Sequence, residues 1–179
     1  MKKLLKKNYK KIGILGGTFD PPHEGHLHIA KVALKKLKLN KILWIVTKKN
    51  PFKKKPYLSK NIRINLSKKL TSKEKKILVK YLDDKVNSMN TIDFINYIKK
   101  NEKKTSLYFL IGADNLKKFH KWNNWEQIPK IAKIVVFARK NYSFKSLSST
   151  VSKKFNKKDW IFINSRKINI SSSLIRKFW

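Results

Sequence analysis

Two histidines in the N-terminal part of the chain have the type and spacing for phosphate chemistry. His23 and His26 are three residues apart and follow a pair of glycines, Gly16 and Gly17. We expect the glycines to close a turn after a strand, where the absence of a Cβ atom lets backbone amides approach an anion. Both imidazoles can point to one side at a helix start, beside the positive end of the helix dipole. The spacing therefore predicts a phosphate site in which both histidines donate to phosphoryl oxygens or protonate a leaving group.

The two histidines could alternatively hold a metal ion. A zinc site takes three or four protein ligands, but the chain has no cysteine and no obvious third ligand near His23 and His26. We therefore expect no metal held by protein side chains. His28 lies two residues beyond His26 and faces another side of the helix, so we interpret it as structural.

A second candidate anion site lies near residue 171. Either Ser171 or Ser172 can cap a helix that runs through Phe178, because a serine hydroxyl accepts a hydrogen bond from a first-turn amide. The first amides of that helix, the serine hydroxyls and Arg176 would together form an anion clamp. The same residues could instead be an ordinary capped helix. The histidine motif elsewhere in the chain favours the clamp.

These candidates lie among alternating strand-like and helix-like segments. Six short apolar runs are typical of strands buried on both faces; they cover residues 12–15, 42–46, 77–79, 107–111, 134–137 and 160–163. Segments long enough for helices lie at residues 26–37, 59–70, 91–100 and in pieces within 114–132. This alternation indicates a parallel sheet with right-handed crossovers. We therefore predict a single Rossmann-like α/β domain over residues 1–179, with helices on both faces of the sheet.

The composition is that of a folded but extremely basic protein. Apolar residues make up 41% of its 179 residues, and its formal net charge is +35. Such a charge suggests nucleic acid as a partner. However, only four of the 45 basic residues are arginine, the side chain preferred for bidentate contacts with phosphates and bases. A compositional bias toward lysine therefore explains the charge better than a nucleic-acid surface, although the field would still attract small anions.

The sequence shows no sign of a membrane or secretion segment. No apolar run approaches the roughly 20 residues that span a bilayer. The basic residues 1–7 are not followed by the apolar stretch of a signal peptide. We therefore expect a cytoplasmic protein without a membrane partner.

Both candidate phosphate sites resemble motifs of one enzyme superfamily. Residues 16–27 are similar to the signature of nucleotidyltransferases with a His-x-Gly-His motif, and residues 170–176 resemble their second motif, Ile-Ser-Ser-x-x-Ile-Arg. The resemblance implies that His23 and His26 are catalytic and stabilise the transferred phosphoryl group. It also implies ATP contacts from Gly16, Gly17, Thr18, Phe19, Ser171, Ser172 and Arg176.

The middle of the chain resembles the bacterial nicotinate-nucleotide adenylyltransferases. The similar segments are residues 111–115, 119–122 and 136–139. The resemblance implies transfer of the adenylyl group of ATP to nicotinate mononucleotide, a step of NAD biosynthesis that releases pyrophosphate. Mg²⁺ would bridge the substrate phosphates, largely through waters. Two alternatives stay open: transfer to nicotinamide mononucleotide or phosphopantetheine, and a basic nucleic-acid-binding protein on this fold.

The resemblance also implies an acceptor site. Trp122 would stack on the pyridine ring, and the chemistry fits because a flat cation favours an indole face. Asp114 would contact nucleotide hydroxyls, Arg139 would bind the phosphate, and Thr91 would lie near the nicotinate carboxylate. Two positions near Thr91 differ from the family, which usually has tyrosine and threonine where this chain has Asn90 and Phe94.

Overall fold

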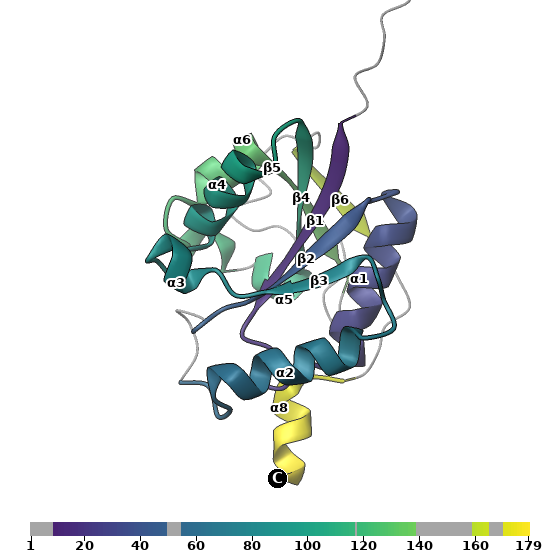
Figure 1. Ribbon diagram of the computed structural model, residues 1–179, viewed down its shortest axis with the longest axis vertical. Coiled ribbons are helices and arrows are strands. Elements are labelled where there is room, and N and C mark those ends of the chain that lie inside the picture. The colour runs from purple at the N-terminus through teal and green to yellow at the C-terminus, as the bar shows by residue number, and fades with distance from the viewer. Residues whose placement is uncertain (1–8, 50–54, 117, 139–158, 165–169) are drawn as a thin grey trace, which may run out of the picture.

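Six parallel strands form the centre of the computed structural model, which describes residues 9–49, 55–116, 118–138, 159–164 and 170–179 (Figure 1). They are β1 (Lys10–Gly17), β2 (Lys41–Val46), β3 (Ile77–Lys80), β4 (Thr105–Gly112), β5 (Ala132–Phe137) and β6 (Trp160–Ile163). Their order across the sheet is β3-β2-β1-β4-β5-β6, and every neighbouring pair is parallel. All six apolar runs are therefore confirmed as strands.

Helices cover both faces of this sheet (Figure 1). The longer ones are α1 (Glu24–Lys36), α2 (Lys60–Thr71) and α4 (Thr91–Asn101); the shorter turns are α3 (Asp83–Val86), α5 (Ala113–Leu116), η1 (Phe119–Lys121), η2 (Trp125–Gln127), α6 (Ile128–Ile131), α8 (Ser172–Ile175) and η5 (Arg176–Phe178). The sequence did not predict α3. It also predicted one helix through Phe178, whereas α8 ends at Ile175 and continues as a 3-10 turn.

The core is divided by the sheet into two apolar clusters, because successive strand residues point to opposite faces. In β2, Leu43 and Ile45 pack with α4 on one face, while Ile42, Trp44 and Val46 pack with α1 on the other. Continuous apolar runs are needed because both faces are covered. The Rossmann-like α/β prediction is confirmed.

The strand order places a cleft next to β1. The chain adds β2 and β3 on one side of β1 and then returns to add β4, β5 and β6 on the other. In open α/β sheets, such a reversal separates the loops that follow the two central strands and leaves a crevice at their carboxyl ends. Here the crevice falls after Gly17 of β1 and Gly112 of β4.

The glycine pair does not form the predicted turn. Gly16 and Gly17 are the last residues of β1, and neither has a positive φ. The chain turns instead at Phe19, whose φ is 49°. The glycines provide space, since a Cβ at Gly16 would lie 3.3 Å from the ring of Phe94 and one at Gly17 would lie 3.3 Å from the ring of Phe19.

Among the described residues, no helix has the length and apolar character needed to cross a bilayer.

Candidate active site

A cavity of about 640 Å³ opens at the carboxyl ends of β1 and β4. Most of the predicted site residues line it: Gly16, Gly17, Thr18, Phe19, His23, His26, Asp114, Trp122, Ser171, Ser172 and Arg176. Segments that are distant in the sequence therefore meet around one space. Thr91 is the first residue of α4 and does not line the cavity. Arg139 lies outside the described residues.

The two histidines cap α1 with their own side chains. The Nδ1 atom of His23, the N-cap residue, accepts a hydrogen bond from the Gly25 amide at 3.1 Å. The Nδ1 atom of His26 accepts one from the His23 amide at 3.3 Å. This is the reciprocal arrangement that serine and glutamate usually form at a helix start. An Nδ1 atom that accepts carries no proton, so each neutral ring presents Nε2–H as its donor.

Aromatic packing fixes the position of these rings. His23 and His26 stack with their centroids 3.7 Å apart. Phe19 contacts His26 edge-on at 5.0 Å and stacks on Trp44 at 4.4 Å. Trp44 belongs to β2 and is completely buried, so the histidine pair is supported by the core. Such pre-organised donors stabilise developing charge without rearranging during a reaction.

A side chain at Gly25, between the two histidines, would be crowded. A Cβ at this position would lie 3.0 Å from the imidazole of His23 and 3.2 Å from the side chain of Ile170. The glycine thus lets the histidine rings and the second motif pack against the same turn. These close contacts account for a glycine, the smallest residue, at this position of the His-x-Gly-His motif.

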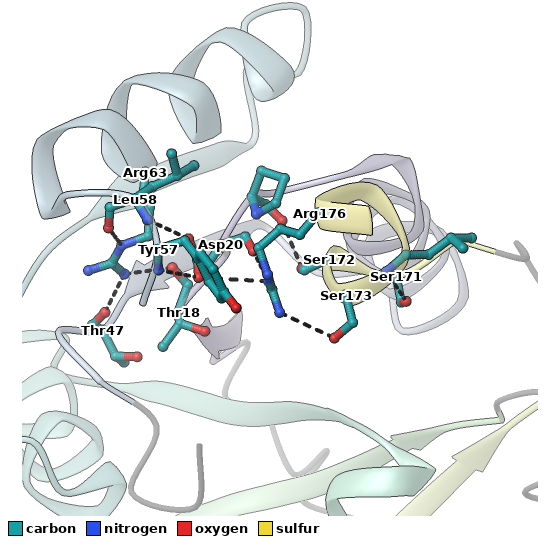
Figure 2. A network of polar contacts seen from close by, with 12 residues as sticks. Thr18, Asp20, Thr47, Tyr57, Leu58, Arg63, Ser171, Ser172, Ser173 and Arg176 are labelled. Carbon is teal, nitrogen blue, oxygen red and sulfur yellow. Dashed lines mark hydrogen bonds and ion pairs between the residues drawn. The ribbon is translucent and has the colours of Figure 1, made fainter. Parts of the chain in front are cut away.

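The second motif begins as a capped helix, with Ser171 rather than Ser172 as the N-cap. The Ser171 hydroxyl accepts from the Leu174 amide at 3.1 Å. Ser172 instead donates its hydroxyl proton to the carbonyl of Pro21 at 2.9 Å. Figure 2 shows α8 seated beside the turn that precedes α1. The two predicted phosphate motifs are therefore in direct contact.

Arg176 strengthens this contact through Asp20. Its guanidinium donates to the backbone carbonyl of Asp20, and Nη1 lies 3.7 Å from the Asp20 carboxylate (Figure 2). The same group lies 4.8 Å from the ring centre of Tyr57 and donates to the hydroxyl of Ser173 at 3.3 Å. A guanidinium has five N–H donors in a planar fork, so it can hold these partners and face the cavity as well.

Two predicted acceptor residues line the same cavity as the second motif. Asp114 is in α5, directly after β4, and Trp122 follows η1. The Trp122 ring packs on the core against Phe109 at 5.9 Å and Phe119 at 5.2 Å. One side of the indole is therefore anchored while the residue still lines the cavity, as a stacking platform requires.

The positions that differ from the family have structural roles here. Phe94 is 2% exposed and packs in the core beside Gly16. Asn90 precedes α4 and donates to the Asp93 carboxylate at 3.1 Å, which also accepts from Ser88 at 2.6 Å.

Sequence reasoning missed three residues that organise the site, namely Asp20, Tyr57 and Arg63. Asp20 accepts hydrogen bonds from the amides of Tyr57 and Leu58 at 2.9 Å each. Arg63 is buried within α2 and donates to loop carbonyls. Arg63 could have been singled out from the sequence. In a chain whose basic residues are nearly all lysine, an arginine indicates a position that needs the several N–H donors of a planar guanidinium. No comparable signal distinguished Tyr57.

The family assignment agrees with this geometry. The sequence profile of the cytidylyltransferase-like family matches residues 14–178. The chain belongs to this family. Within it, the "Probable nicotinate-nucleotide adenylyltransferase" of Pelagibacter ubique is 49% identical over 173 residues, which cover 97% of this chain and 96% of that one. The protein with the same name from Clostridium tetani is 40% identical, over 94% of this chain and 86% of that one. The chain is thus a nucleotidyltransferase of the nicotinate-nucleotide adenylyltransferase group.

Solved structures with lower identity share the family's fold. The structure described as "Plasmodium falciparum nicotinic acid mononucleotide adenylyltransferase complexed with NaAD" gives a TM-score of 0.79 at 23% identity, over 95% of this chain and 84% of that one. The same enzyme complexed with APC gives a TM-score of 0.76 at the same identity and coverage. The cytidylyltransferase-like chain thus has the architecture of these enzymes along nearly its whole length.

Proposed function

We propose that this enzyme transfers the adenylyl group of ATP to nicotinate mononucleotide, forming nicotinate adenine dinucleotide and pyrophosphate. The single observation that carries the proposal is the convergence on one cavity of the histidine pair, the second phosphate motif and the Asp114–Trp122 side. The names of the similar Pelagibacter and Clostridium proteins support the same acceptor.

In the proposed reaction, a 5′-phosphate oxygen of the mononucleotide attacks the α-phosphorus of ATP. The bond from that phosphorus to the oxygen bridging to the β-phosphate breaks, and pyrophosphate leaves with the electron pair. The attacking phosphate is already anionic, so the protein's contribution is positioning and charge stabilisation. The Nε2–H groups of His23 and His26 would donate to the α-phosphoryl and bridging oxygens, because their Nδ1 atoms are occupied as caps.

The second motif would hold the leaving pyrophosphate. Arg176 supplies a charged fork suited to phosphate oxygens. Ser171 accepts from a helix amide and so keeps its own hydroxyl proton to donate. Ser172 uses its proton on Pro21, so its main role would be to attach α8 to the first motif.

We propose that Mg²⁺ enters bound to ATP. Among the described residues, no group of three or more histidine, aspartate or glutamate side chains is arranged to hold a metal. Asp20, a carboxylate that lines the cavity, is already bonded to two amides and Arg176. Mg²⁺ is commonly held by substrate phosphates and waters, which suits this donor set. When bound, it would neutralise phosphate charge.

The proposal is tested by an acceptor panel. Purified full-length protein with Mg–ATP is given nicotinate mononucleotide, nicotinamide mononucleotide or 4′-phosphopantetheine, and pyrophosphate release is measured. We expect nicotinate mononucleotide to give the highest kcat/KM. A higher value for another acceptor would overturn the assignment. Salt-dependent RNA or DNA binding without any pyrophosphate release would favour the nucleic-acid alternative.

A further inference from the structure

Arg63 lies at the centre of a buried polar network beside the cavity. It is 2% exposed, and its guanidinium donates to four backbone carbonyls, of which Figure 2 shows those of Thr18, Thr47 and Leu58. The acceptors are Thr18 at 2.6 Å, Thr47 at 2.7 Å, Leu58 at 3.1 Å and Lys48 at 3.3 Å. These carbonyls belong to three separate segments: the turn after β1, the exit of β2 and the entry to α2.

Two carboxylates hold the same segments by their amides. Asp20 accepts from the Leu58 amide at 2.9 Å, and Asp83 accepts from the Lys48 amide at 2.6 Å. Leu58 and Lys48 thus each donate to a carboxylate and accept from Arg63. The cation and the two anions are linked through backbone dipoles and form no ion pair with one another among the described residues.

This network extends to the second phosphate motif. Arg63 holds the carbonyl of Thr18, two residues before Asp20, and the carbonyl of Leu58, whose amide binds Asp20. Asp20 in turn holds Arg176 through its backbone carbonyl and its carboxylate. A path of direct contacts therefore runs from the buried face of α2 to the guanidinium at the cavity.

Packing alone does not account for an arginine at this position. The buried residues of α2 are all polar, namely Arg63, Ser67 and Thr71. Burying a guanidinium is costly, and burial lowers the pKa of Arg63. An apolar residue would fill such a space at lower cost. The arginine is required where one side chain must hold several carbonyls in a fixed geometry.

We propose that Arg63 is a positioning residue for the phosphate end of the cavity: through Thr18, Leu58 and Asp20 it determines where Arg176 lies. The inference rests on the proposed function to the extent that Arg176 is taken to contact ATP. Arg63 itself touches no substrate. Its loss should weaken ATP binding while the acceptor side, at Asp114 and Trp122, is unaffected.

The test compares Arg63→Lys and Arg63→Met with the core variant Ile98→Ala, which is destabilised at a distance from the network. Dissociation constants for Mg–ATP without acceptor are measured by calorimetry, and KM values are measured for both substrates. We expect each Arg63 variant to bind ATP about tenfold more weakly, as expected for a displaced charge-assisted hydrogen bond. The KM for the acceptor should stay within about twofold, and Ile98→Ala should bind ATP like the wild type. Unchanged ATP affinity in a folded Arg63 variant would overturn the proposal.

A double-mutant cycle separates positioning from general destabilisation. In an Arg176→Ala background, Arg63→Lys should change ATP affinity by less than about twofold, because the group it positions is gone. An equal tenfold loss in both backgrounds would overturn the proposal.

A second variant is needed if neither Arg63 variant folds. Asp20→Asn interrupts the same path, and it must then weaken ATP binding or the proposal fails. A wild-type protein that binds ATP but makes no dinucleotide would refute the proposed function alone, because these affinities still test Arg63.

Discussion

The two phosphate motifs meet at one cavity but are held in place in different ways. His23 and His26 cap a 13-residue helix whose buried residues, Leu27, Ala30 and Ala33, join the core. Ser171 caps a four-residue helix that has no buried residue. This second helix projects from the edge of the body, beneath α2 in Figure 1, and attaches to the turn of the first motif.

This difference indicates that one half of the site is built locally and the other depends on it. The histidine rings are bonded to amides of their own segment. Arg176 and Ser172, in contrast, are bonded to Asp20 and Pro21 of the first motif. A change in the second motif should therefore leave the histidines in place. A change in the first motif should displace Ser172 and Arg176, because they are bonded to it.

The largest effect is expected from removing a histidine. His26→Ala should lower kcat by about 10²–10⁴-fold, the range for a lost proton donor or charge-stabilising group. The fold should persist because the buried face of α1 is unchanged. Pyrophosphate release and circular dichroism measure the two effects. The matched control is His28→Ala on the same helix, which should keep near-normal turnover; near-normal turnover in His26→Ala would contradict the catalytic role.

A smaller effect, confined to one substrate, is expected from the second motif. Arg176→Ala should raise the KM for ATP by about 10–100-fold, since a charge-assisted hydrogen bond contributes about 1.5–3 kcal/mol. The melting temperature should change little because neither α8 nor η5 buries a residue. Steady-state kinetics and thermal unfolding measure this, with the neighbouring exposed Lys177→Ala as the control. An equal rise in the KM for the acceptor would contradict the assignment of Arg176 to the ATP side of the cavity alone.

The smallest effect concerns the carboxylates behind the first motif. Burial raises the pKa of Asp83 above its ordinary value. The folded state then takes up a proton before the unfolded state as pH falls, so ionised Asp83 reduces stability above that pKa. Relative to wild type, Asp83→Asn should therefore gain stability as pH rises from about 4, and level off above the raised pKa.

The neighbouring Asp84 provides a control of opposite sign. It is exposed, and its hydrogen bond to Lys60 lowers its pKa. Its small contribution is present above the ordinary carboxyl pKa and is lost as pH falls. Asp84→Asn should thus lose stability relative to wild type as pH rises toward about 4, and run level with it above that pH. Urea unfolding of the three proteins between pH 2 and 8 distinguishes these trends; a difference from wild type that does not change with pH in either variant would contradict its assignment.

Local patterns were sufficient to predict the strands, the three longer helices and the two motifs. The apolar runs predicted the strands because burial on both faces leaves no polar position, as in Leu43 and Trp44 of β2. The spacing of His23 and His26 predicted their shared side because a helix start fixes it.

The connecting residues could not be predicted in this way. The bonds from Arg63 to Thr18 and Thr47 depend on tertiary distances between loops, which no local pattern encodes. The close packing of Gly16 against Phe94 was not predicted, because Phe94 belongs to a helix more than 70 residues away. The predicted roles of Asp114, Trp122 and Arg139 stay predictions.

The contact between α8 and the first motif also has a consequence for synthesis. Ser172 and the Pro21 carbonyl that it binds are 151 residues apart in the chain. At about 5–20 residues per second, the ribosome makes these two partners about 8–30 s apart. Throughout that interval, the nascent chain has its histidines but lacks the second wall of the cavity. The enzyme is therefore completed by docking a late segment onto an early one, so a nascent chain that has not reached residue 171 lacks half of the site.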